Sequence, residues 1–196
     1  MRRESPVICL DCNTAIAAFQ HDPPSNIAIH RDRVRHFIRE HYGARILFPA
    51  IALSEYLWKA DQAGLETAIQ GAVAATMFAP AFDEVTATIA ANLGRLFVAE
   101  RKSNSEVARL TPDRVAMRAD LLIVATALQY SAKYLLTNDT GCFTVAQFSK
   151  RITPILIRDL PDPPPPSPPA TPPPPRPPSR AGTLFDVLDA DENESA

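Results

Sequence analysis

The sequence predicts an α/β fold with a mostly parallel central sheet covered on both faces by helices. Short apolar runs alternate along the chain with long helical patterns, which is typical of parallel sheets. The runs predicted as strands are Val7–Leu10, 45–48, 134–136 and 152–157. A composition of 46% hydrophobic and 21% charged residues over 196 positions indicates one globular domain with an additional segment.

The helices are predicted from apolar spacing and from their start signals. One helical segment covers about 27–42, and a second begins after Pro49. Within 83–101, five apolar residues fall on one predicted face: Val85, Ile89, Leu93, Leu96 and Phe97. A further helix is predicted over 111–133, because Thr111-Pro112 supplies an N-cap followed by proline in the first turn.

The chain is predicted to divide near residue 160. Thirteen of its 20 prolines lie within 161–178, and such a segment should form an extended polyproline II spacer rather than a core. The expected organisation is a folded domain over 1–160, a proline-rich linker over 161–182 and an acidic tail over 183–196. The tail contains a short amphipathic motif and is expected to be disordered unless it docks on a partner.

Charge is distributed unevenly along the chain. Residues 161–196 carry six acidic and two basic side chains, whereas the rest carries 16 acidic and 18 basic ones. A mildly basic body is compatible with a polyanionic substrate without requiring one. No secretory signal or membrane span is evident, and three cysteines are too few for a disulfide framework. A cytoplasmic protein is therefore expected.

Four carboxylates fall where a parallel sheet would bring them together. Asp11 follows the first predicted strand and Asp139 follows the third, so both are expected at the carboxyl edge, where open α/β sheets bind ligands. Glu55 and Asp120 interrupt apolar helix faces that we expect to turn inward. Several carboxylates at one edge repel one another unless a divalent cation neutralises them.

Each acid also has a structural explanation. An acid after a strand is often a helix N-cap, which would suit Asp11 and Asp139. Glu55 shares its predicted face with Ile51 and Trp58, and an acid on such a face is often paired with a nearby basic group. For any one acid a structural role is favoured, but the coincidence of all four favours a functional site.

Four short blocks in the same order resemble the motifs of PIN domains. The blocks are Asp11-Cys12-Asn13 after the first strand, 49–55 ending at the glutamate, 119–128 around Asp120, and 135–139 at a strand end. The middle segment 78–96 is similar to the VapC-like toxins of toxin–antitoxin systems. The resemblance covers about residues 6–157.

This resemblance implies a three-layer α/β/α PIN-like sandwich and an endoribonuclease that cleaves single-stranded or structured RNA. It implies Mg²⁺ or Mn²⁺ held by four catalytic carboxylates, Asp11, Glu55, Asp120 and Asp139. The resemblance also implies that Asn13 and Thr137 support these acids. A toxin of this kind would act with a cognate antitoxin, and a homodimer is expected. Gly141 stands where some members carry a further aspartate, so the resemblance does not decide whether the site holds one metal ion or two.

Hard oxygen ligands independently suit Mg²⁺ or Mn²⁺ rather than zinc. A basic cluster could steer RNA phosphates or could be a solvated helix face: Arg31, Arg33, Arg35 and Arg39. The alternative function is a non-catalytic PIN-like module that tethers partners through its proline-rich tail. A phosphoryl-transfer domain also places an aspartate after its first strand and usually has the motif Asp-x-Asp. It is disfavoured here, because Asn13 occupies the place of the second aspartate.

Overall fold

The computed structural model describes residues 5–20, 22–60, 62, 64–66, 77–104 and 114–165. The contacts between residues divide the chain into two compact units, Met1–Pro163 and Pro164–Ala196. The elements given below belong to the first unit. The predicted linker and acidic tail lie outside the described residues from 166 onward, and so does the predicted helix start at Thr111-Pro112.

A parallel sheet forms the centre of the first unit. In the described part of the chain it has five strands, in the order β3-β2-β1-β4-β5. These are β1 (Val7–Leu10), β2 (Arg45–Leu47), β3 (Met77–Phe78), β4 (Tyr134–Thr137) and β5 (Thr153–Leu156). Every neighbouring pair runs parallel, and β1 lies between β2 and β4. The residues that follow β1 and β4 are therefore neighbours at the carboxyl edge.

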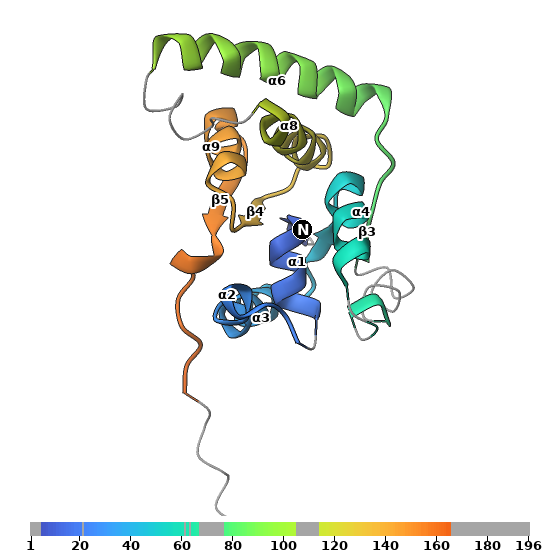
Figure 1. The fold of residues 1–196 in the computed structure, drawn as a ribbon, viewed down its shortest axis with the longest axis vertical. Coiled ribbons are helices and arrows are strands. Elements are labelled where there is room, and N and C mark those ends of the chain that lie inside the picture. Colours follow the sequence, from blue (N-terminus) through green and yellow to red (C-terminus); the bar gives the residue numbers. More distant parts are fainter. Residues whose placement is uncertain are drawn as a thin grey trace, which may run out of the picture. The chain divides into compact units, whose positions relative to one another are not determined.

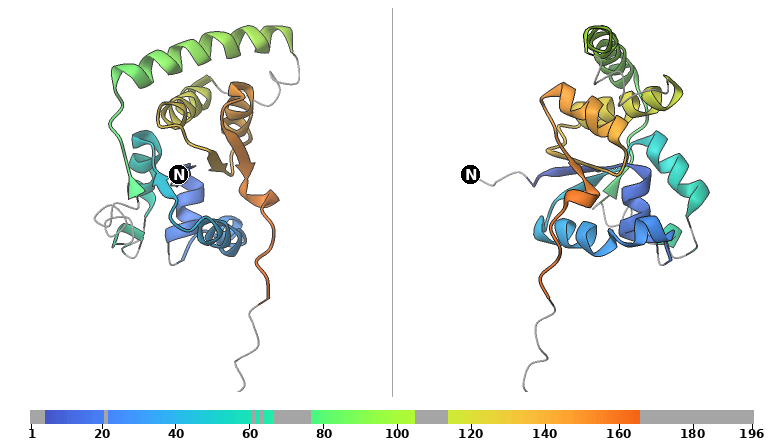
Figure 2. Two further views of the ribbon diagram at one scale, coloured as in Figure 1. Left: turned by 180° about the vertical axis from the view of Figure 1, so that it is seen from behind. Right: turned by 60° about the vertical axis from the view of Figure 1, so that its left-hand side comes forward.

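Helices cover both faces of the sheet, as the sequence predicts (Figure 1). Those on one face are α1 (Cys12–Phe19), α2 (Ser25–Ala28) and α3 (Arg31–Glu40). Those on the other face are α8 (Arg114–Gln129) and α9 (Thr140–Ser149). The long helix α6 (Glu84–Ser103) lies outside α8, and α4 (Ala50–Lys59) lies beside the sheet (Figure 2). A short 3-10 helix, Ile157–Asp159, follows β5.

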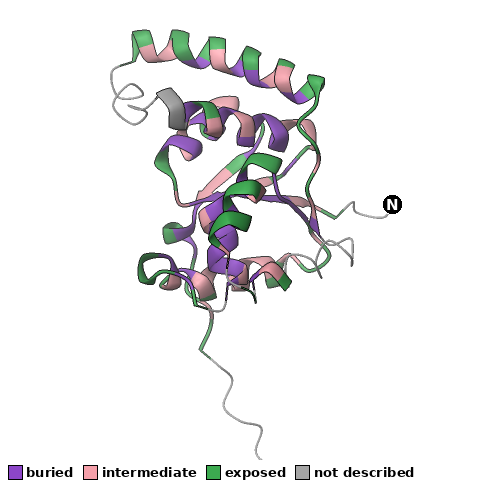
Figure 3. Cartoon of the chain, turned by 45° about the vertical axis from the view of Figure 1, so that its right-hand side comes forward, coloured by how far each residue is buried: buried purple, intermediate pink, exposed green. Residues whose placement is uncertain are grey.

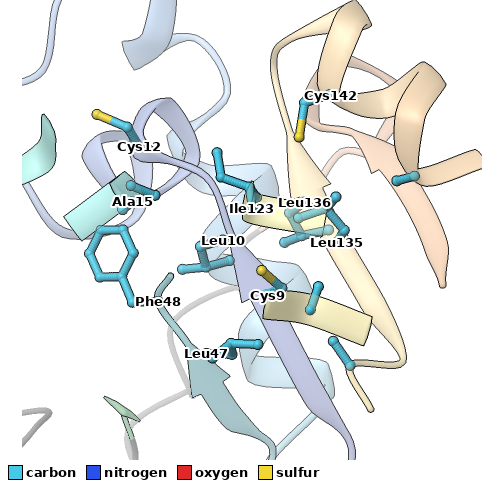
Figure 4. Close-up of a cluster of buried hydrophobic side chains, with 14 of the residues drawn as sticks. Cys9, Leu10, Cys12, Ala15, Leu47, Phe48, Ile123, Leu135, Leu136 and Cys142 are labelled. Carbon is cyan, nitrogen blue, oxygen red and sulfur yellow. The ribbon is translucent and has the colours of Figure 1, made fainter. Parts of the chain in front are cut away.

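The three central strands supply the core. Their apolar side chains are buried because helices cover both faces, which is why the strands read as continuous apolar runs. Leu10, Leu47 and Leu136 are fully buried, and Figure 4 places them among residues contributed by the helices. The three cysteines belong to the same interior and are free and buried. Burial raises the pKa of the Cys9 and Cys142 thiols well above the usual value, so packing accounts for both.

The predicted buried face of α6 is partly wrong. Val85 and Leu96 are 56% and 62% exposed, and Figure 3 shows exposed positions running along the outer side of this helix. The buried stripe is instead formed by Thr86, Ala90, Leu93 and Phe97. Spacings of four, three and four residues keep these positions on the side that contacts α8.

Other element boundaries also differ from prediction. The expected helix over 27–42 is interrupted at Ile29 and His30 and forms α2 and α3. The expected helix to residue 133 ends at Gln129, and Ser131 adopts a left-handed conformation with φ of 52°. Neither β3 nor α9 was singled out by the sequence pattern. None of the helices in the described ranges has both the length and the apolar character needed to cross a membrane.

Candidate active site

Asp11 is fixed at the junction of β1 and α1. It is the N-cap of α1, and its Oδ1 accepts a hydrogen bond from the Thr14 backbone N–H at 2.7 Å. Its Oδ2 accepts from the Thr137 hydroxyl at 2.5 Å and from the Asn138 N–H at 3.2 Å. Burial raises the pKa of Asp11, while these hydrogen bonds act in the opposite direction. The residue is only 5% exposed.

Thr137 connects the two aspartates that follow the central strands. While its hydroxyl donates to Asp11, the same oxygen accepts a hydrogen bond from the Asp139 N–H at 2.9 Å. Asp139 in turn is the N-cap of α9, and its Oδ1 accepts from the Gly141 N–H at 2.5 Å. Both carboxylates therefore lie at the N-terminus of a helix, where the helix dipole favours negative charge.

Asp120 reaches the same place from α8. It is 8% exposed, and its pKa is raised to about 7, first by burial and then by the negative charges of Asp139 and Asp11. Gly141 permits this close approach of carboxylates. A Cβ atom at position 141 would lie 2.8 Å from Asp120 Oδ2 and 3.0 Å from Asp139 Oδ1. A side chain at position 141 would therefore require these carboxylates to move.

Glu55 departs from its prediction. The sequence pattern places it on an inward-facing apolar side of its helix, but it is exposed, as are its face-mates Ile51 and Trp58. The buried positions of α4 are Ala52 and Tyr56, which turns the face carrying Glu55 toward solvent. Its Oε1 instead lies 2.6 Å from the ammonium nitrogen of Lys59.

All four predicted acids nevertheless line one cavity of about 250 Å³. Its lining residues come from α1, α4, α8 and the segment after β4: Asp11, Cys12, Asn13, Glu55, Ala119, Asp120, Ile123, Asp139 and Cys142. None of these described lining residues is a lysine or an arginine. Ala119 and Ile123 were not proposed as site residues, because a small or apolar side chain gives no chemical signal in the sequence. Cys12 and Cys142 were not proposed either, and the Cys9-x-x-Cys12 spacing is better explained by packing than by a redox or zinc site.

The donor set of the cavity fits a hard divalent cation in its chemistry. Carboxylate oxygens are the ligands that Mg²⁺ and Mn²⁺ prefer. The pKa of Asp120 is raised by burial and, after that, by the negative charges of Asp139 and Asp11, and a cation would offset these charges. The arrangement is not preassembled. Within the described residues, no three His, Cys, Asp or Glu side chains are already grouped to hold a metal ion. The Glu55 side chain, paired with Lys59, would have to turn.

The predicted RNA-binding arginines all lie on α3 and donate to acceptors within the protein: Arg31, Arg33, Arg35 and Arg39. These acceptors are backbone carbonyls and, for Arg33, also the carboxylate of Asp162 at 2.6 Å. Because a guanidinium has five N–H donors, further donors are available beyond these bonds. The arginines therefore have a structural role, and their remaining donors are compatible with a contact to phosphate. They do not line the carboxylate cavity.

The chain matches one protein-family model and has similarity to several solved structures. A match to the PIN-domain family covers residues 8–148. Among solved structures, VapBC2 from Rickettsia felis bound to a promoter DNA fragment is 15% identical, with a TM-score of 0.48, over 76% of this chain and 98% of that one. Leishmania major tyrosyl-tRNA synthetase in complex with tyrosinol is 18% identical, with a TM-score of 0.42, over 80% of this chain and 32% of that one. The search of curated proteins found no match.

The fold and the acidic cavity define a class of α/β proteins that gather carboxylates at the carboxyl edge of a parallel sheet. The chain belongs to the PIN-domain family, because the family match spans well over half of its length. PIN domains are in general nucleases and in general use divalent metals. The resemblance seen in the sequence motifs is thereby confirmed at the level of the family and the fold.

Proposed function

We propose that this chain is a divalent-metal-dependent endoribonuclease and the toxin of a toxin–antitoxin pair. The observation that carries the nuclease proposal is the cavity at the sheet edge, because four acids from separate segments line it together. A site that concentrates negative charge without a lining cation is suited to a metal and, through the metal, to a phosphodiester.

The proposed roles follow from the geometry of each acid. Asp11 and Asp139 are rigid, since both cap helices and Thr137 bridges them, so they are the fixed ligands. Asp120 adds a ligand from α8, and Glu55 adds one from an exposed side chain of α4. A bound Mg²⁺ or Mn²⁺ would supply an activated water and offset charge on the phosphate. The Asn13 side chain at the cavity wall is suited to orient a phosphate oxygen.

The toxin proposal rests on sequence and on exposed apolar side chains. Segment 78–96 resembles the toxin branch of the family. Large apolar residues are exposed on α4 and near the start of α6, and they include Trp58, Phe82 and Val85. Exposed apolar residues of this size favour a protein partner. We assign them to the antitoxin or to a second copy in a homodimer, with the protein acting in the cytoplasm where its RNA substrate would be.

One observation favours the alternative of a non-catalytic binding module, namely that no three ligands are grouped in the described residues. A metal-dependent cleavage assay separates the two. Purified protein is incubated with single-stranded RNA in Mn²⁺ or in EDTA, alongside Asp139→Asn and Asp83→Asn. Asp83 is a matched control, because it is also a helix N-cap but does not line the cavity.

We expect cleavage in Mn²⁺ by the wild type and by Asp83→Asn, and none in EDTA. Asp139→Asn should fold, because asparagine is an equally good N-cap, but it should lose at least about 100-fold in activity, the size of effect known for removing one group that stabilises charge in a transition state. Equal activity of the Asp139 and Asp83 variants would refute the assignment of the cavity. Absence of any Mn²⁺ binding by the wild type would instead support the binding module.

A further inference from the structure

Within the described part of the chain, Glu55 is the acid of the cavity that forms an ion pair. Its Oε1 lies 2.6 Å from Nζ of Lys59, one helical turn further along α4. The two side chains are 50% and 47% exposed, respectively. An exposed pair at this spacing is a weak interaction, so a divalent cation can compete with it successfully.

Lys59 is held beside the cavity by its backbone. Its carbonyl oxygen accepts a hydrogen bond of 3.0 Å from Nε2 of Gln20, a buried residue at the end of α1. Its ammonium group therefore lies next to Glu55, a residue that lines the cavity, while Lys59 itself is not among the lining residues.

Glu55 is the acid of the cavity whose availability to a metal Lys59 can control. The acids line one cavity, yet no three of the potential ligands among the described residues are grouped to hold a metal. Glu55 is the acid held by a competing cation, and it is also the most exposed helical member of the set. Because Glu55 is paired with Lys59, it must leave the ammonium group before it can join Asp11, Asp120 and Asp139 around a metal.

We propose that Lys59 exchanges partners as the site fills, pairing with Glu55 in the metal-free protein and with an RNA phosphate once a divalent cation takes Glu55. This inference rests on the proposed nuclease function. Lys59 is thus a positioning residue for Glu55, and it becomes a substrate contact only in the loaded site. The metal and Lys59 compete for the carboxylate of Glu55. Metal binding releases Lys59 for the RNA, so metal binding and RNA binding strengthen each other.

The exchange predicts effects of opposite sign on two kinds of binding. Replacing Lys59 with methionine removes both the competitor for Glu55 and a nearby positive charge, so Mn²⁺ should bind about two- to fivefold more tightly. The same replacement removes a phosphate contact, so the KM for RNA at saturating Mn²⁺ should rise by about three- to tenfold. A purely structural role of Lys59 would move both affinities in the same direction or move neither.

The experiment uses the full chain and titrates Mn²⁺ alone by calorimetry, followed by cleavage kinetics on a single-stranded RNA that the wild type cleaves. The variants are Lys59→Met, Lys59→Arg as the charge-conserving rescue, and Lys102→Met as the control. Lys102 is an exposed lysine in the last turn of α6, away from the cavity. Two further variants test whether the lysine acts through Glu55. One is the single variant Glu55→Gln, and the other combines Glu55→Gln with Lys59→Met.

We expect Lys59→Met alone to tighten Mn²⁺ binding while raising KM, with Lys59→Arg and Lys102→Met close to the wild type. In the Glu55→Gln background, the tightening by Lys59→Met should shrink to about 1.5-fold or less. Unchanged or weaker Mn²⁺ binding by Lys59→Met overturns the inference and leaves the nuclease proposal standing. Full tightening without Glu55 overturns it as well, and a wild type that binds no Mn²⁺ overturns both.

Discussion

The cost of ionising Asp120, which arises first from its burial and then from the charges of Asp139 and Asp11, can be measured through protein stability. The pKa of Asp120 in the folded protein is about 7, against an ordinary value of 3.8. The folded protein therefore binds a proton at this residue between about pH 4 and pH 7, where the unfolded chain has already lost it. The contribution of Asp120 to the free energy of unfolding must then fall as the pH rises through this window.

The size of the effect follows from the shift. About 1.4 kcal/mol per pKa unit over about three units gives a ceiling of about 4 kcal/mol. Because Asp139 and Asp11 share the charge interaction, we expect about half of this value, or about 2 kcal/mol. Asp120→Asn removes the titrating group while keeping its shape. In the metal-free protein, this variant should be about 2 kcal/mol more stable than the wild type at pH 8 and nearly equal to it at pH 4.5.

Urea unfolding in EDTA at the two pH values measures this difference. For an unfolding slope near 2 kcal/mol/M, the midpoint at pH 8 should shift upward by about 1 M. Asp32→Asn, which removes an exposed acid of α3, is the control and should not show the same change between the two pH values. A stability difference for Asp120→Asn that is the same at both pH values, or a loss of stability at pH 8, would refute the reasoning.

Three other changes have clear expected outcomes. Gly141→Ala should unfold at lower urea, by about 1–3 kcal/mol, and should cleave RNA poorly, because its Cβ would lie 2.8 Å from Asp120 Oδ2; wild-type stability would contradict this. Thr137→Val should cost about 1–3 kcal/mol in the same assay, since Asp11 and the Asp139 N–H lose a buried partner; a neutral effect would mean that this bridge is not important. Arg39→Gln should weaken RNA binding for every sequence and reduce the slope of log affinity against log salt by about one; an unchanged slope would exclude Arg39 from the RNA interface.

The strand ends were the most predictable part of the fold and of the cavity. Asp11 and Asp139 each follow a short apolar run, and the parallel sheet brings the ends of such runs to one edge whatever their separation in the sequence. Asp120 was also placed correctly on an inward face, because its neighbours Met117 and Val124 are buried. In these cases one strong local pattern determines the position.

The position of Glu55 was harder to predict, because two faces of α4 are apolar. The sequence shows Ile51 and Trp58 on one side and Ala52 and Tyr56 on the other, and only packing against the rest of the chain decides which is buried. The sequence does contain one signal that Glu55 is exposed, namely Lys59, because a lysine four residues after a glutamate predicts an ion pair on a helix surface. Strand β3, with two residues, is too short to give a periodic pattern.

The chemistry of the RNA ends tests the central claim most directly. A divalent metal held by Asp11, Glu55, Asp120 and Asp139 would supply hydrolysis that does not need the ribose 2′-hydroxyl, so cleavage products formed in Mn²⁺ should carry a linear phosphate and a free hydroxyl. Mass spectrometry of the products should show these ends, and a substrate with 2′-deoxyribose at the scissile position should still be cut. A 2′,3′-cyclic phosphate end, or cleavage that continues in EDTA, would contradict a metal-dependent carboxylate nuclease.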